Sequence, residues 1–94
     1  MPTHSEDAHF LREWERLTRA QQAQFKAALI KFIHDLGIGA FRPGLRVKRY
    51  QGREGVFEMT WAANGRALFR YGNEVHPGEP HIEWLSIGTH DIFN

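Results

Sequence analysis

Basic residues and one carboxylate recur along three short segments in the C-terminal half of the chain, and side chains of these types handle phosphate. The segments span 45–50, 55–61 and 65–71, and they carry Arg46, Lys48, Glu58, Arg66 and Arg70. A guanidinium group binds phosphate oxygens through paired hydrogen bonds, and a carboxylate held among cations stays ionised and can accept a proton. A surface that collected these groups, with little apolar area, would be a candidate phosphate-handling surface.

The three segments have the composition of antiparallel strands, and their pairing register decides which side chains share a face. A slip of one residue turns every side chain of a strand to the other face. The pair Asn64-Gly65 predicts a hairpin whose loop has two or three residues. A two-residue loop would place Arg66 and Arg70 on the face of the preceding aromatic residues. A three-residue loop, 63–65 with Gly65 left-handed at a bulge, would place them on the opposite face.

The hydrophobic pattern favours the three-residue loop. It places one mainly apolar set toward a core, comprising Phe57, Met59, Trp61, Ala67, Phe69 and Tyr71. The opposite face receives Glu58, Thr60, Arg66, Leu68 and Arg70. In the preceding segment Leu45 and Val47 point inward, which turns Arg46, Lys48 and Tyr50 outward and leaves Arg49 at an edge.

Two helices are predicted before these segments. Residues 6–17 carry an apolar stripe behind Ser5, which can cap a helix. Residues 19–36 repeat apolar side chains at helical spacing, begin after the capping-box sequence Thr18-x-x-Gln21, and end before Gly37.

The predicted fold is a single α+β domain over residues 1–94. A helical hairpin (6–36) packs on one face of a four-stranded, mostly antiparallel twisted sheet (45–88), and a tail (89–94) follows. Within that sheet the segment 81–87 lacks clean alternation, which is typical of a central strand buried on both sides.

Bulk composition excludes several classes of function. The 94 residues contain no cysteine, which excludes disulfides, thiolate metal sites and thiol catalysis. The net charge of +1 and the pI of about 8.2 are too mild to indicate nucleic-acid binding by themselves.

With neither a signal peptide nor an apolar run long enough for a membrane, the expected location is the cytoplasm. His76, Glu79 and His81 have no spacing that forces them together, so no metal or other cofactor is expected.

The order of these features resembles one known group of proteins. Two helices and a basic strand are followed by Gly55-Val56-Phe57-Glu58-Met59-Thr60, by Gly65-Arg66-Ala67-Leu68-Phe69 and by Ile87-Gly88-Thr89-His90-Asp91-Ile92-Phe93. Over residues 6–94 this arrangement resembles the RelE/HigB superfamily of toxins from type II toxin–antitoxin systems. The superfamily includes ribosome-dependent mRNA endonucleases and, in its ParE branch, gyrase inhibitors. The resemblance implies a cognate antitoxin as partner, with the ribosome and mRNA as further partners in the nuclease branch.

In the nuclease branch the resemblance implies metal-independent cleavage, in which a ribose 2′-hydroxyl attacks the adjacent phosphate. Such a reaction needs a base, an acid and cations that stabilise the added charge. The implied catalytic residues are Glu58 as base, Arg66 as phosphate ligand and His90 as acid. Arg46 and Lys48 match the basic strand that follows the RNA backbone, and Arg49 and Arg70 are candidates for the same contact.

A structural alternative exists for Glu58, because an ion pair with Arg70 across the strands would explain both side chains without catalysis. Both hypotheses stay open from the sequence. The chain also differs from the family pattern at two positions: the common Glu-x-Arg motif reads Glu58-Met59-Thr60, and a terminal tyrosine is replaced by Phe93. These differences motivate a second hypothesis, a non-nucleolytic toxin of the gyrase-inhibiting branch or a binding module that has lost cleavage.

Overall fold

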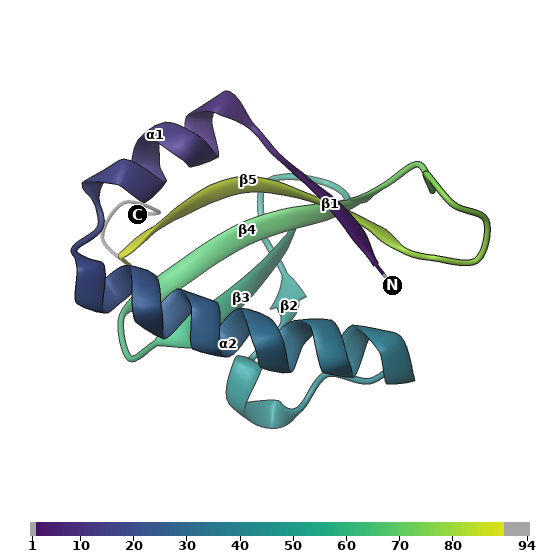
Figure 1. Ribbon diagram of the computed structural model, residues 1–94, viewed down its shortest axis with the longest axis horizontal. Coiled ribbons are helices and arrows are strands. Elements are labelled where there is room, and N and C mark those ends of the chain that lie inside the picture. The colour runs from purple at the N-terminus through teal and green to yellow at the C-terminus, as the bar shows by residue number, and fades with distance from the viewer. Residues whose placement is uncertain (1, 90–94) are drawn as a thin grey trace.

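Two helices lie on one side of a twisted five-stranded sheet in the computed structural model, which describes residues 2–89 (Figure 1). The elements in chain order are β1 Thr3–Glu6, α1 Ala8–Arg16, α2 Arg19–Ile38, the 3₁₀ helix η1 Pro43–Leu45, β2 Lys48–Arg49, β3 Phe57–Ala62, β4 Gly65–Gly72 and β5 His81–Thr89. The strand order is β1-β5-β4-β3-β2, with β1 parallel to β5 and the other neighbours antiparallel. The predicted α+β class is confirmed, and the predicted number of four strands is wrong.

The strand that the sequence did not predict is β1. It pairs with the first half of β5, from Thr3 opposite His81 to Glu6 opposite Trp84. Its four residues are polar and mostly exposed, so no hydrophobic alternation marks them as a strand. Ser5 was predicted to cap the first helix, but it lies within β1, and Asp7 occupies the N-cap of α1.

α2 begins at the predicted residue, Arg19, and ends at Ile38, two residues beyond the predicted end at residue 36. Thr18 Oγ1 accepts a hydrogen bond from Gln21 N at 3.1 Å, and Thr18 N donates to Gln21 Oε1 at 2.9 Å, which completes the capping box. Gly37 lies inside the helix, and Gly39 is the left-handed C-cap with φ of 82°. Within residues 2–89 no helix is both long and apolar enough to cross a membrane.

The β3–β4 hairpin has the predicted faces but not the predicted loop. Ala62 pairs with Gly65, so residues 63 and 64 alone form the loop, and the register shift falls at Trp61 instead of at a left-handed Gly65. A Cβ on Gly65 would lie 2.5 Å from the Trp61 ring, so glycine is what allows the indole to pack across the neighbouring strand. The bulge keeps the face assignment intact, with Met59 and Phe69 fully buried.

Most of the predicted strand over 45–50 is not a strand. Leu45 ends η1, and Arg46 is left-handed with φ of 48°, so ladder pairing is confined to Lys48 and Arg49. Leu45 and Val47 still pack against the core, as the alternation predicts. Because a left-handed residue cannot continue an extended strand, the basic segment starts with a turn.

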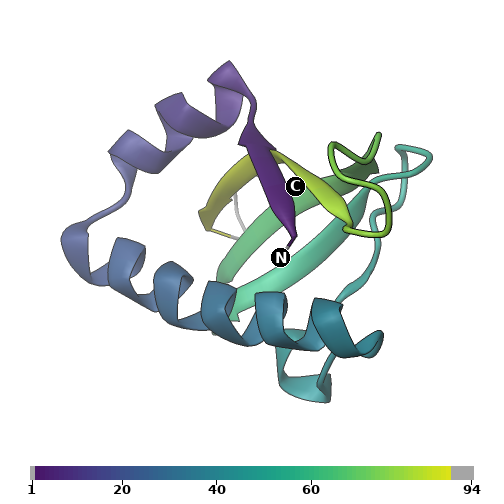
Figure 2. The same cartoon turned by 45° about the vertical axis from the view of Figure 1, so that its right-hand side comes forward.

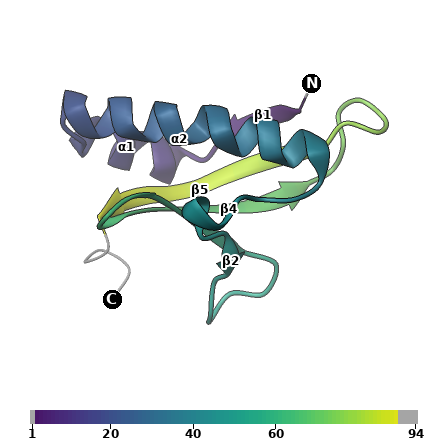
Figure 3. The ribbon, with the colours of Figure 1, turned by 90° about the horizontal axis from the view of Figure 1, so that it is seen from below.

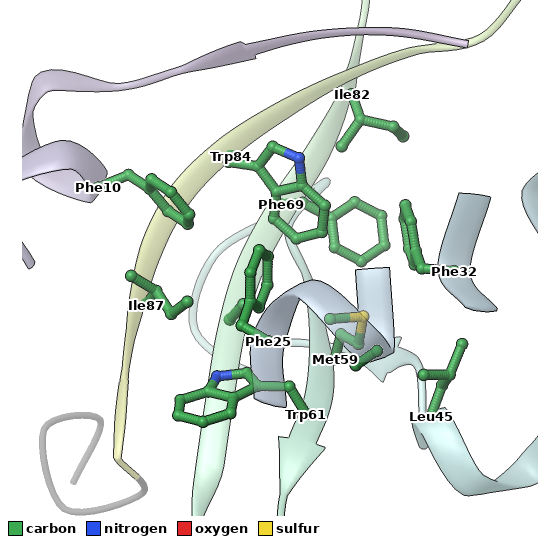
Figure 4. Close-up of a cluster of buried hydrophobic side chains, with 12 residues drawn as sticks. Phe10, Phe25, Phe32, Leu45, Met59, Trp61, Phe69, Ile82, Trp84 and Ile87 are labelled. Atoms are coloured by element: carbon green, nitrogen blue, oxygen red, sulfur yellow. The ribbon is translucent and has the colours of Figure 1, made fainter. Parts of the chain in front are cut away.

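The core lies between the sheet and the helices and is built largely from aromatic rings (Figure 4). Phe32 of α2 lies with its ring centroid 5.0 Å from that of Phe69 and 5.2 Å from that of Trp84. Phe10 of α1 reaches the same Trp84 ring at 6.1 Å. These contacts commit one face of the sheet to packing, so the opposite face is the one open to function.

The two helices diverge from their connection instead of packing along their lengths (Figure 2). An apolar hollow of about 280 Å³ lies between them, with Phe10, Trp14 and Ile82 in its lining. Two further lining side chains stay largely exposed, Leu11 at 49% and Ile33 at 38%. The predicted helical hairpin is therefore an open one.

α1 also covers the part of the β5 edge that β1 leaves free. β1 ends opposite Trp84, and beyond that point Glu13 Oε1 accepts hydrogen bonds from Ser86 Oγ at 2.5 Å and from Ile87 N at 3.1 Å. One helical carboxylate thus supplies the acceptor that a neighbouring strand would otherwise provide.

Candidate nucleic-acid interface

The sheet face opposite the helices carries charged groups that the strand register predicts. Across β2 and β3 Lys48 lies opposite Glu58, and across β3 and β4 Thr60 lies opposite Arg66. Their neighbour Met59 is fully buried on the core side, so alternation turns Glu58 and Thr60 outward. Figure 3 shows this face turned away from the helices, with β2 and the loop after it standing out from the sheet.

Glu58 is held beside Lys48. Its Oε1 lies 3.5 Å from Lys48 Nζ, and the Glu58 side chain is 14% exposed whereas that of Lys48 is 67% exposed. A separation of 3.5 Å is an ion pair without a short hydrogen bond. Glu58 therefore keeps oxygen lone pairs for a proton donor, and the exposed ammonium can also contact a phosphate.

Arg70 does not pair with Glu58, so the ion pair between them that the sequence suggests is not formed. Arg70 Nε lies 2.5 Å from Glu83 Oε1, and the hydrogen bond to this carboxylate raises the pKa of the Arg70 guanidinium. The register explains the choice, because Leu68 lies opposite Glu58 while Arg70 lies opposite Glu83. The position of Glu83 between the apolar residues Ile82 and Trp84 is the sequence signal that could have identified this partner.

Arg66 turns back over the hairpin loop. Its Nη1 donates to the Gly65 carbonyl at 2.9 Å and lies 3.4 Å from the carbonyl oxygens of Ala62 and Ala63. Within the described part of the chain no carboxylate pairs with Arg66, so neutral acceptors hold the guanidinium and its charge is not compensated locally. Such a group can exchange carbonyl oxygens for those of a phosphate.

Arg46 and Arg49 lie at the edge of this face rather than at its centre. Both side chains are exposed, and neither makes an ion pair with another residue of 2–89. The left-handed Arg46 follows η1, and Arg49 ends the short β2. Of the predicted RNA-binding cations, Lys48 and Arg70 are paired, whereas these two have no carboxylate partner among residues 2–89.

A small apolar cluster divides the face. Val56, Leu68 and Leu85 are buried together, and Tyr50 packs against them. The three side chains are only 3–6% exposed, so they add little apolar surface to this face. The register shift between β4 and β5 makes Leu85 an extra residue, which brings it beside Leu68. On β4, Leu68 separates Arg66 from Arg70.

The predicted acid His90, and with it Phe93, lies outside the described residues. Among residues 2–89, no three histidine, aspartate or glutamate side chains are placed to hold a metal ion. In the described part of the chain, the groups suited to proton transfer and phosphate binding are Glu58, Lys48 and Arg66.

Solved structures that share this fold are toxins of toxin–antitoxin systems. The E. coli DinJ–YafQ toxin–antitoxin complex contains a chain that matches with a TM-score of 0.73 and 8% identity, covering 97% of this chain and 94% of that one. A copper-bound mutant toxin from Helicobacter pylori matches with a TM-score of 0.72 and 10% identity over 98% of each chain. The intact E. coli RelBE toxin–antitoxin complex matches with a TM-score of 0.62 and 16% identity, over 95% of this chain and 96% of that one.

Neither a protein-family model nor a curated protein matches the sequence. At these identities the likeness establishes the fold, and it confirms the fold implied by the resemblance to RelE-like toxins.

Proposed function

We propose that this chain is the toxin of a type II toxin–antitoxin pair and that it cleaves mRNA on the ribosome. The observation that carries the proposal is the face on which Glu58, Lys48 and Arg66 lie on adjacent strands. The same fold occurs in structures of the YafQ and RelE toxins, which supports the toxin assignment.

In the proposed reaction Glu58 removes the proton of a ribose 2′-hydroxyl, and the 2′-oxygen attacks the adjacent phosphorus. The bond from phosphorus to the 5′-oxygen breaks, which leaves a 2′,3′-cyclic phosphate on one fragment. The departing oxygen takes up a proton to give a 5′-hydroxyl, and His90 is the proposed donor. Arg66 stabilises the charge that builds up on the phosphate by moving from the loop carbonyls to phosphate oxygens.

A cognate antitoxin is the expected protein partner, because two of the similar structures are toxin–antitoxin complexes. Such a partner would either cover the basic face or displace a helix beside it. A segment that folds on binding is suited to this task, since it can wrap a large surface.

The test is a map of RNA 5′ ends after expression in bacteria. Wild type is expected to stop translation and to produce new ends at a fixed position within codons. Glu58→Gln removes the base and is expected to lower cleavage about 10²–10⁴-fold. Arg66→Ala removes one charge-stabilising donor and is expected to lower it about 10²-fold or more.

The matched controls are Glu15→Gln and Arg12→Ala, which change the same residue types on exposed positions of α1. Both controls are expected to cleave as wild type does. Wild-type levels of cleavage in both Glu58→Gln and Arg66→Ala would refute the assignment of the catalytic face.

A second candidate is a non-nucleolytic toxin that binds gyrase. Two observations favour it: Thr60 stands opposite Arg66 where the family motif has a cation, and an apolar cluster of Val56, Leu68 and Leu85 occupies part of the face. It predicts DNA damage and inhibited supercoiling with intact mRNA. Codon-phased RNA ends cannot arise from gyrase inhibition, so the same map separates the two functions.

A further inference from the structure

The mild net charge of the chain conceals a strong local asymmetry. Five of the 12 basic residues lie within 42–53, a stretch that contains no acidic residue. Residues 71–89 show the opposite balance, with Glu74, Glu79 and Glu83 and no lysine or arginine. An electrostatic footprint depends on where the charges sit, so the protein has a basic side despite a net charge of +1.

Ion pairing separates the cations that already have a carboxylate partner from those that are available to a ligand. Within residues 2–89 the cations Arg42, Lys48 and Arg70 are paired with Asp35, Glu58 and Glu83 respectively. By contrast, Lys31, Arg46, Arg49 and Arg53 are all exposed and form no ion pair in the same part of the chain. Of these four, Lys31 and Arg53 were not among the sites predicted from the sequence.

These four cations line two separate hollows. Lys31 of α2 and Arg46 line one of about 510 Å³, together with Thr60 of β3, and no acidic side chain lines it. Arg49 and Arg53 line the second, of about 520 Å³, where Glu54 is the one acidic residue. The second hollow belongs to the loop that stands out from the sheet beside the open face in Figure 3.

The loop owes its shape to glycine at two positions. Gly52 and Gly55 have φ of 97° and 76°, and Tyr50 N donates to the Val56 carbonyl at 2.8 Å across the base of the loop. Tyr50 and Val56 also pack in the apolar cluster of the open face. The loop is therefore anchored at its base, and Arg49 and Arg53 are presented from a defined support next to Glu58.

We infer that Lys31, Arg46, Arg49 and Arg53 form a basic edge that binds the phosphate backbone of RNA and guides it to the open face. This inference rests on the proposed function and adds to it a direction of approach. RNA reaches Glu58 from the β2 side, because residues 71–89 carry no lysine or arginine and Arg70 is already paired with Glu83. The shared chemistry is a row of phosphates, which either mRNA or ribosomal RNA supplies.

The experiment measures binding against salt concentration with two probes, a single-stranded RNA that carries non-cleavable 2′-O-methyl groups and purified E. coli ribosomes. The variants are the doubles Arg49→Ala/Arg53→Ala and Lys31→Ala/Arg46→Ala. The matched control is Arg12→Ala/Arg16→Ala, which removes the same charge from exposed positions of α1. Circular dichroism confirms that each variant is folded.

Each test double is expected to reduce the slope of log K against log salt by about 1.4 for single-stranded RNA, since each phosphate contact contributes about 0.7. The control double is expected to leave the slope unchanged. Arg49→Lys/Arg53→Lys is expected to retain it, because the contact depends on charge. A loss with the oligonucleotide identifies mRNA as the ligand, and a loss confined to ribosomes identifies ribosomal RNA.

The inference is overturned if both test doubles bind both probes as the control double does. A wild type that produces codon-phased RNA ends while the doubles bind normally would refute the basic edge alone. A wild type that binds RNA through this edge without producing such ends would refute the nuclease and retain the edge.

Discussion

At the scale of single residues, the function of each charge depends on its partner. Glu58 and Arg70 both lie on the predicted face, but they do not pair with each other. Glu58 forms an ion pair with Lys48, and Arg70 forms one with Glu83. Alternation alone predicts the face because the side-chain period of a strand is two. It does not predict the partner, because a shift of two residues preserves every face and changes every cross-strand pair.

Asp35 and Arg42 provide a prediction at this scale. Asp35 is 3% exposed and accepts hydrogen bonds from Arg42 Nε at 2.8 Å, Arg42 Nη2 at 2.9 Å and Arg42 N at 2.9 Å. The side-chain hydrogen bonds, followed by the backbone one, lower the pKa of Asp35 from 3.8 to about 2. Because folding lowers this pKa, the ionised Asp35 carboxylate stabilises the folded state above pH 3.8. That stabilisation is lost as the pH falls toward 2 and the carboxylate becomes protonated.

Asp35→Asn should therefore lower the Tm at pH 7 by about 5–10 °C and flatten the fall of Tm between pH 4 and pH 2. Thermal unfolding of both proteins across that range measures the effect. Glu15→Gln, on an exposed position of α1, should follow the wild-type curve. Parallel curves for wild type and Asp35→Asn would show that the Arg42 contact does not govern acid stability.

At the scale of elements, the sequence predicts correctly those features that depend on neighbouring residues alone, and it fails where a segment distant in sequence determines the structure. The capping box of Thr18 and Gln21 needs only one turn of chain, and the structure confirms it. β1 needs His81–Trp84 as its ladder partner, so its own four polar residues carried no signal. The predicted loop length is wrong because the bulge lies at Trp61 and not at Gly65.

Two glycines predict opposite effects of the same substitution. Gly65→Ala should lower the free energy of unfolding by about 1–3 kcal/mol, because the new methyl group would meet the Trp61 ring within 2.8 Å. Gly37→Ala should raise it by about 0.5–1 kcal/mol, because Gly37 lies inside α2 with nothing within 4 Å of a new Cβ. Urea unfolding measures both, and a stabilising Gly65→Ala would contradict the close Trp61 packing.

At the scale of the whole molecule, the helical layer and the last strand meet at Glu13. Glu13→Ala would leave the buried Ser86 hydroxyl and the Ile87 N–H without their acceptor. The free energy of unfolding should fall by about 1–3 kcal/mol, and hydrogen exchange at Ile87 should become faster. Glu13→Gln keeps a carbonyl oxygen in place and should lie between the two. Unchanged exchange at Ile87 in Glu13→Ala would show that the carboxylate does not protect the β5 edge.

The position of β5 between β1 and β4 also sets the order in which the protein can be completed during its own synthesis. β1 is made early, yet it has no strand to pair with until His81–Trp84 has been translated, and the Glu13 contact waits for Ser86 and Ile87. Contacts of such long sequence separation form slowly, because the intervening chain must first be closed into a loop. The sheet is therefore incomplete until His81–Thr89 has been synthesised. A chain that stopped before His81 would therefore leave β1 without its partner strand and Glu13 without Ser86 and Ile87.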